Sequence, residues 1–280
     1  MDARPVVVVA ERIAAVGLAE LAQHAEVVDA VGASRPELVE LLGPAQGLLV
    51  RSATIVDADM IAAAPSLQVI GRAGIGVDNI DLEAATAAGV LVVNAPAANV
   101  ISAAEHTMAL ILSQARNVPR ADATLRAGVW DRKSFEGIEL HGKTLGVIGL
   151  GRVGTLVAQR AHAFGMALLA YDPFVGHERA RRIGVELTDD LDRLYAIADV
   201  ITIHLPKTRD TEGLVDKEAL EKMRDGVRII NTSRGGIIDE PALAEAIRSG
   251  KVAGAALDVF AEEPLGDSPL LALPQVVLTP

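Results

Sequence analysis

A glycine-rich turn near the middle of the chain has the spacing of a phosphate-binding loop. Gly149, Gly151 and Gly154 follow the apolar run 144–148, and a helical pattern begins directly after them. In such a turn the first glycine permits the tight bend, the second lets the backbone approach a pyrophosphate, and the third allows helix and strand to pack closely. The N–H groups at the helix start favour the phosphate charge. The spacing therefore predicts a dinucleotide site.

An acidic residue stands where such a site would receive a ribose. Asp172 follows the apolar run 167–171, eighteen residues after Gly154. A carboxylate there accepts both ribose hydroxyls of NAD and repels a 2′-phosphate, and no arginine follows it directly, so NAD is favoured over NADP. The alternative is an ordinary strand-to-helix turn in which Asp172 caps the helix.

Three charged residues follow two later predicted strands. Arg234 comes after the run 227–231, and Asp258 and Glu263 come after the run 253–257. Ligands of open α/β sheets bind at the carboxyl ends of the strands, and a guanidinium suits a carboxylate bidentately. Taken singly, each has an alternative: a surface ion pair, a cap and a solvated loop acid. Together, they indicate a substrate site beside the dinucleotide.

Alternating strands and helices must position these residues. Short apolar runs without alternation are typical of strands buried on both faces, and we expect them at 6–9, 48–50, 69–70, 89–94, 144–148, 167–171, 200–203, 227–231, 253–257 and 276–278. The alternation of strand and helix predicts an α/β fold of two Rossmann-like or flavodoxin-like domains with parallel sheets, the cofactor domain doubly wound. We expect a boundary near residues 95–100, with domains 1–97 and 98–280.

Helical stretches lie between the predicted strands. One begins near Ser34, where Ser34 and Glu37 have the spacing of a capping box, and another covers about 81–88. A long one, 100–117, is followed by a polar arm, 120–142, that carries Trp130. The apolar long helix and the arm predict a homodimer interface; the alternative is that this helix only connects the domains.

Composition narrows the class of protein. The 280 residues carry a formal charge of −11, which argues against a nucleic-acid surface, and they include no cysteine, which excludes disulfides and thiolate nucleophiles. No apolar run reaches the length of a membrane span, and the first residues do not resemble a signal peptide. We therefore expect a cytoplasmic protein with a small-molecule substrate, no metal, no nucleic acid and no membrane partner.

The motifs together resemble one known family. Residues 149–154 with Asp172, residues 231–239 and residues 258–264 match the D-isomer-specific 2-hydroxyacid dehydrogenases in order and spacing, and the resemblance covers essentially the whole chain. Four further stretches are similar to the phosphoglycerate-oxidising members: 50–54, 72–79, 94–99 and 256–260. The resemblance implies NAD-dependent oxidation of D-3-phosphoglycerate to 3-phosphohydroxypyruvate, the first step of L-serine biosynthesis.

It also implies a role for each matching position. The cofactor-binding residues it implies are Gly149, Gly151, Arg152, Val153, Gly154, Asp172, Leu205, Thr232, Ser233, Arg234 and Asp258. Those for the substrate are Arg51, Arg72, Gly74, Ile75, Gly76, Val77, Asn99 and Arg132, with Arg51 and Arg72 meeting the phosphate and Arg132 reaching a neighbouring subunit. Arg234 and Glu263 are the implied catalytic residues. Asp258 would face the nicotinamide carboxamide, and Glu263 would partner a catalytic histidine.

The family's catalytic histidine has no counterpart in this chain. It follows a Thr-Pro or similar pair, and the sequence ends at Thr279 and Pro280. We therefore expect a truncated form, which also lacks a helix returning to the first domain, and which binds cofactor with little turnover. The six histidines present are His24, His106, His141, His162, His177 and His204. His204, at a strand end beside the cofactor, is the only plausible substitute base.

Two alternatives stay open. One is a sibling dehydrogenase of the glyoxylate or hydroxypyruvate reductase type, for which Arg51, Arg72 and Arg132 would have no phosphate to bind. The other is an NAD(H)-sensing binding protein similar to the transcriptional corepressors built on this fold.

Overall fold

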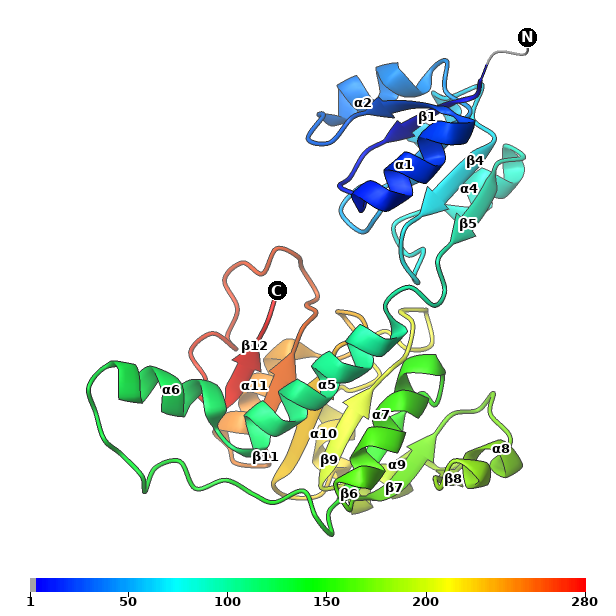
Figure 1. Ribbon diagram of the computed structural model, residues 1–280. Helices are drawn as coiled ribbons and strands as arrows, with labels where there is room; N and C mark the ends of the chain where they lie inside the picture. Colours follow the sequence, from blue (N-terminus) through cyan, green and yellow to red (C-terminus); the bar gives the residue numbers. More distant parts are fainter. Residues whose placement is uncertain (1–3) are drawn as a thin grey trace. The chain divides into compact units, whose positions relative to one another are not determined.

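The computed structural model describes residues 4–280, and the chain divides into two compact units, Met1–Asn99 and Val100–Pro280. Each unit is built around one sheet whose strands all run parallel, with helices between consecutive strands except β11 and β12, which a loop connects (Figure 1). The expected α/β class with parallel sheets is thereby confirmed. Among the helices of residues 4–280, none is both long enough and apolar enough to cross a membrane.

The first unit contains a five-stranded sheet in the order β2-β1-β3-β4-β5. Its strands are β1 (Val6–Val9), β2 (Glu26–Asp29), β3 (Gly47–Val50), β4 (Val69–Arg72) and β5 (Leu91–Asn94). Its helices are α1 (Ala15–His24), α2 (Arg35–Leu42), α3 (Ala58–Ala62) and α4 (Leu82–Ala87). The capping box of α2 forms as the sequence predicts, because the Ser34 N–H donates to Glu37 Oε2 at 2.7 Å.

The sequence analysis did not predict β2. This strand lies at the edge of the sheet, so only one side of it is paired, and its ends are the exposed residues Glu26 and Asp29. An edge strand with exposed residues does not have to be apolar throughout, unlike an inner strand that is buried on both faces. Its short polar-ended pattern therefore lacks the signal that identified the inner strands.

The second unit contains a seven-stranded sheet in the order β12-β11-β10-β9-β6-β7-β8. Its strands are β6 (Thr144–Ile148), β7 (Ala167–Tyr171), β8 (Glu186–Thr188), β9 (Val200–Ile203), β10 (Val227–Asn231), β11 (Val252–Leu257) and β12 (Val276–Leu278). Its helices are α5 (Val100–Ala115), α6 (Val118–Arg126), α7 (Arg152–Ala163), α8 (His177–Arg182), α9 (Leu191–Ile197), α10 (Lys217–Lys222) and α11 (Glu240–Arg248).

The strand order makes this second sheet doubly wound. The chain starts at β6, proceeds outward through β7 and β8, and then returns to the other side of β6 to add β9, β10, β11 and β12. One buried cluster joins α5 and α7 to the sheet, and another joins α9, α10 and α11 to it. The direction of winding changes between β6 and β9, and in open α/β sheets the crevice for a ligand lies at that point.

Two expectations for the long helix and its arm need correction. The helix ends at Ala115 rather than at residue 117, because Asn117 adopts a left-handed backbone with φ 54°. The following segment is not arm throughout, since α6 occupies its first part and stands off the sheet before the chain returns to β6 (Figure 1). Pro119 near the start of α6 fits a helix that begins there.

Candidate functional site

The glycine turn between β6 and α7 has the geometry of a pyrophosphate-binding loop. Gly149 has φ 93°, and a Cβ placed on it would lie 2.6 Å from the carbonyl oxygen of His204. A Cβ on Gly154 would collide with the carbonyl oxygen of Gly149. A Cβ on Gly151 would meet nothing within 4 Å among residues 4–280. Two glycines thus permit close packing, while the third presents backbone to open space at the start of α7, where a phosphate fits.

Asp172 is fixed to this turn at the end of β7. Its Oδ2 accepts a hydrogen bond from the backbone N–H of Leu150 at 2.8 Å, and its Oδ1 accepts one from Phe174 at 2.9 Å. It does not cap the next helix, because α8 begins after Gly176. Each carboxylate oxygen has two acceptor positions, so ribose hydroxyls can still be bound. The sequence analysis missed the bond to Leu150, which ties Asp172 to the glycine turn.

The segment after β10 is organised by Asn231, which is buried. Its Oδ1 accepts from the backbone N–H and hydroxyl of Ser233 at 3.0 and 2.9 Å, and its Nδ2 donates to the carbonyl oxygen of Arg234 at 2.9 Å. Thr232 shares a hydrogen bond of 2.7 Å between hydroxyls with Thr107 of α5. The predicted residues 232–234 are therefore held in a defined turn at the carboxyl end of the strand.

The segments after β10 and β11 pack directly on each other. A Cβ on Gly235 would collide with the carbonyl oxygen of Phe260, so the chain after Arg234 touches the chain after Asp258. Glu263 turns back on its own segment, where its Oε1 accepts from the Phe260 N–H at 3.0 Å; within residues 4–280 this is its only hydrogen bond. The structure thus brings the Arg234 and Asp258 segments together and leaves Glu263 exposed.

His204 follows β9 as expected and is a poor candidate for a base. Its Nε2 lies 3.0 Å from the hydroxyl of Thr202, and burial lowers the pKa of His204 to about 4. The imidazole is therefore neutral at neutral pH and holds a proton weakly, whereas an efficient general base has a pKa near the working pH. Leu205, next along the chain, is partly buried beside the glycine turn.

The sequence analysis also missed His106. Its Nε2 lies 2.9 Å from Asp258 Oδ1 and 3.1 Å from the hydroxyl of Thr279. His106 lies on α5, and the separation of 152 residues from Asp258 leaves no local sequence signal for this contact. The sequence analysis placed His106 only on a helix of the first half of the chain. The structure shows that its side chain contacts residues that directly follow β11 and β12 in the second unit.

In the first unit, a carboxylate organises the segment after β3. Glu11 Oε1 accepts from the N–H groups of Arg51 and Thr54 at 2.8 and 3.0 Å, and its Oε2 accepts from Ala53 at 3.2 Å. Burial on its own would raise the pKa of Glu11, but the backbone bonds, chiefly from Arg51, outweigh it and hold the pKa below its ordinary value. Asn79 Nδ2 donates to the carbonyl oxygens of Arg51 and Thr54 at 2.9 and 2.6 Å.

The segment after β4 contains the other predicted substrate residues. The guanidinium of Arg72 lies against Gly74, where it occupies the space that a Cβ would need. Asn94, at the end of β5, donates from Nδ2 to the carbonyl oxygen of Ile75 at 2.6 Å. Arg51 directly follows β3, Arg72 is the last residue of the adjacent strand β4, and residues 74–77 come just after it, so all lie at the carboxyl ends of these two strands. Asn99 and Arg132 are exposed, Asn99 at the end of this unit and Arg132 in the second.

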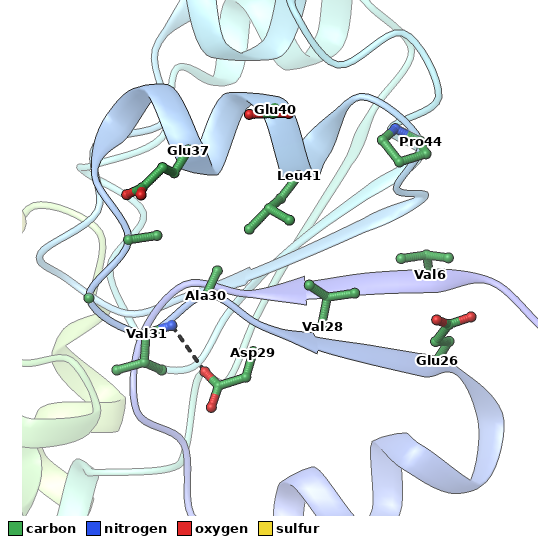
Figure 2. A pocket seen from close by; sticks show the side chains of 12 residues that line it. Val6, Glu26, Val28, Asp29, Ala30, Val31, Glu37, Glu40, Leu41 and Pro44 are labelled. Atoms are coloured by element: carbon green, nitrogen blue, oxygen red, sulfur yellow. Dashed lines mark hydrogen bonds between the residues drawn. The ribbon is translucent and has the colours of Figure 1, made fainter.

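A cavity of about 860 Å³ elsewhere in the first unit does not fit the predicted chemistry. It lies between β2 and α2 (Figure 2), and none of the predicted site residues lines it. The acidic side chains around it are Glu26, Asp29, Glu37 and Glu40. Such a lining repels an anionic substrate, so this cavity is not the candidate site.

Comparison with known proteins defines the family. Residues 108–280 match the model described as D-isomer specific 2-hydroxyacid dehydrogenase, NAD binding domain. The chain is 55% identical over 276 residues to a D-3-phosphoglycerate dehydrogenase of Mycobacterium tuberculosis, covering 99% of this chain and 52% of that protein. The chain therefore belongs to the D-isomer specific 2-hydroxyacid dehydrogenase family, and its cofactor is NAD. It spans about half the length of the curated relatives it matches.

Solved structures agree with this assignment. A glyoxylate reductase from Paecilomyes thermophila superposes with a TM-score of 0.91 at 30% identity, covering 100% of this chain and 88% of the other. A D-lactate dehydrogenase from Aquifex aeolicus, complexed with NAD and lactic acid, gives a TM-score of 0.86 at 30% identity, covering 98% and 87%. Both likenesses extend over nearly the whole of this chain.

Proposed function

We propose that the protein oxidises D-3-phosphoglycerate to 3-phosphohydroxypyruvate with NAD, and so supplies the first step of L-serine biosynthesis. The observation that carries the proposal is the pair of arginines, Arg51 and Arg72, that lies at the carboxyl ends of adjacent strands of the first sheet, beside the 74–77 segment. An unphosphorylated 2-hydroxy acid offers one anionic group, whereas a phosphorylated one offers two. The relative from Mycobacterium tuberculosis, with its 55% identity, supports the same substrate.

We propose a division of labour between the domains. Residues 1–97 bind the substrate, with N–H groups of residues 74–77 on its carboxylate and the arginines on its phosphate. Residues 98–280 bind NAD, with the backbone of Gly151, Arg152 and Val153 on the pyrophosphate and Asp172 on the adenosine ribose. The doubly wound order supports this placement, because Asp172 and the segments after β10 and β11 lie on opposite sides of the switch point.

The chemistry needs a hydride acceptor, an oriented substrate and a base for the hydroxyl proton. When bound, NAD supplies the hydride acceptor. Arg234 holds the carboxylate and hydroxyl oxygens of the substrate so that the carbon to be oxidised keeps one orientation. Glu263 partners the imidazole that the family resemblance implies as the base, and favours its protonated form. His204, with its pKa of about 4, does not serve as that base.

Turnover with matched substrates tests the proposal. NADH formation is followed with D-3-phosphoglycerate, D-glycerate and D-lactate, in the 280-residue chain and in a chain with about forty further residues, enough for the implied histidine and a returning helix. We expect phosphoglycerate to be preferred wherever turnover occurs, and Arg234→Ala to abolish it. Arg193→Ala, which removes an exposed arginine paired with Glu186, is the matched control. Preference for an unphosphorylated acid would favour the glyoxylate reductase type instead.

We also propose that the protein self-associates through residues 118–142. The apolar side chains that suggested an interface on the long helix are buried within the second unit; among them are Ala104, Met108 and Ile111. Apart from Ile101 near the start of α5, the large apolar side chains left exposed nearby belong to the following segment: Val118, Leu125, Val129 and Trp130. Light scattering at micromolar concentration tests this proposal, and a monomer alone would contradict it.

A further inference from the structure

Two side chains from distant segments hold Asp258 at the carboxyl end of β11. Thr279, just after β12, donates its hydroxyl hydrogen to Asp258 Oδ1 at 2.6 Å. His106, from α5, places Nε2 2.9 Å from the same oxygen. Because a carboxylate only accepts, Nε2 must carry the hydrogen of that bond. The orientation of the carboxylate is therefore fixed from α5 and from the segment after β12 together.

Both bonds reach the same carboxylate oxygen. Within residues 4–280, Oδ2 of Asp258 accepts no hydrogen bond, so its lone pairs are left for another donor. The cluster is also within reach of a ligand, since 39% of the His106 side chain and 26% of the Asp258 side chain are exposed. A carboxylate with one oxygen anchored and the other open can receive an amide N–H at a fixed position.

We propose that His106 is a positioning residue for the nicotinamide end of NAD, acting through Asp258. This rests on the proposed placement of Asp258 against the nicotinamide carboxamide. His106 and Thr279 hold Oδ1, which aims Oδ2 at the carboxamide –NH₂ and so restricts the rotation of the nicotinamide ring. Loss of the imidazole frees the carboxylate to turn, and the amide hydrogen bond weakens.

A role that is merely structural makes a different prediction. If His106 only ties α5 to the strand ends, its removal lowers stability and weakens every ligand of the crevice alike. If it positions Asp258, its removal affects ligands that carry nicotinamide and spares ADP-ribose, which has the same adenosine, pyrophosphate and second ribose without the ring. The ratio of the two affinities therefore separates the roles.

Calorimetric titration of the 280-residue chain with NAD and with ADP-ribose provides the test. We expect His106→Ala to weaken NAD about three- to tenfold, the range for one ordinary hydrogen bond, because the bond from the carboxamide to Asp258 is weakened and not removed. ADP-ribose should be unchanged within about twofold. His106→Gln, which can still donate to Asp258, should restore most of the NAD affinity. Thr279→Val, which keeps volume and removes only the hydroxyl, should give a smaller loss of the same kind. His24→Ala, in the other unit, is the control.

The emission of bound NADH provides a second readout, because it reports the surroundings of the nicotinamide ring. It should change in His106→Ala and Asp258→Ala, and remain as in the parent chain in His24→Ala. Equal weakening of NAD and ADP-ribose by His106→Ala, or no recovery with Gln, would overturn the positioning role. If Asp258→Ala itself leaves the NAD to ADP-ribose ratio unchanged, the proposed place of Asp258 fails as well. A selective effect of Asp258→Ala without one of His106→Ala overturns only the inference about His106.

Discussion

In the second unit, the turn between β6 and α7 is shaped by backbone packed on backbone, whereas in the first unit the segment after β3 is shaped by a side chain. Gly149 and Gly154 allow contacts with the carbonyl oxygens of His204 and Gly149 that no Cβ would permit. Glu11, by contrast, gathers three backbone N–H groups onto one carboxylate. Both arrangements place N–H groups or cations at the carboxyl ends of parallel strands. They differ in which substitutions disrupt them.

Backbone packing is insensitive to pH and intolerant of any added atom. The Glu11 carboxylate with its three backbone hydrogen bonds, here called the Glu11 clamp, tolerates small changes of volume but depends on the charge of the carboxylate. The turn between β6 and α7 should therefore respond to substitution in an all-or-none manner, and the segment after β3 should respond gradually and with a pH dependence. Each prediction below addresses one side of this difference.

The largest effect is expected at Gly154. Gly154→Val should lower the free energy of unfolding by about 3 kcal/mol, the upper end of the ordinary cost of overpacking, because its Cβ would collide with the Gly149 carbonyl. Gly151→Ala should leave stability within about 0.5 kcal/mol and still weaken NAD, since its Cβ points into the open phosphate position. Denaturant unfolding and NAD titration measure the two effects. A stable Gly154→Val chain with normal NAD affinity would remove the packing argument.

Asp172 should give the next largest effect. Asp172→Ala should weaken NAD by about 1–3 kcal/mol, the cost of losing hydrogen bonds to a charged group, and should also loosen the turn through the lost bond to Leu150. The parent chain should bind NAD clearly more tightly than NADP. Calorimetric titration with both nucleotides checks this, and equal affinities would refute the ribose role of Asp172.

Glu11 should give a smaller effect that depends on pH. Glu11→Gln should lower the free energy of unfolding by about 1 kcal/mol at pH 7. Because the pKa of Glu11 in the folded chain lies below its ordinary value of 4.5, the ionised carboxylate stabilises the fold above that value, and the contribution is lost as the pH falls through the lower folded pKa. The difference between parent and variant should therefore shrink below about pH 4.5.

Thermal unfolding from pH 3.5 to 8 follows this difference, with Glu20→Gln on the exposed face of α1 as the control. A Glu11→Gln deficit that is constant across this range would mean that shape, rather than charge, holds the segment after β3.

The smallest effect on stability is expected in residues 118–142. Trp130→Asp should change the free energy of unfolding by less than about 0.5 kcal/mol, because this side chain is 78% exposed. It should nevertheless reduce self-association. A dimer that persists in Trp130→Asp and Leu125→Asp by light scattering would exclude this segment as the interface.

The difference between the glycine turn and the Glu11 carboxylate also explains which parts of the fold and of the candidate site could be predicted from the sequence. The glycine turn and Asp172 have a local signature, because the steric demands of Gly149, Gly151 and Gly154 act over a few residues. The clamp of Glu11 joins positions forty and more residues apart, and the contact of His106 with Asp258 spans 152. Such contacts depend on strand order, which the alternation of strands and helices does not specify. The inner strands β6 and β10 were predicted with their exact bounds, whereas the edge strands β2 and β8, which each contain polar residues, were missed. The edge strand β12 was still found, because Val276–Leu278 are all apolar.

Binding of a matched ligand pair tests the central claim, that two arginines of the first unit select a phosphorylated acid for an NAD-dependent dehydrogenase. D-3-phosphoglycerate and D-glycerate differ only in the phosphate, and calorimetric titration of the 280-residue chain loaded with NADH needs no turnover. We predict that D-3-phosphoglycerate binds at least about tenfold more tightly, and that Arg51→Ala and Arg72→Ala each reduce this preference while Arg193→Ala does not. Equal binding of the two acids by the parent chain would contradict the claim.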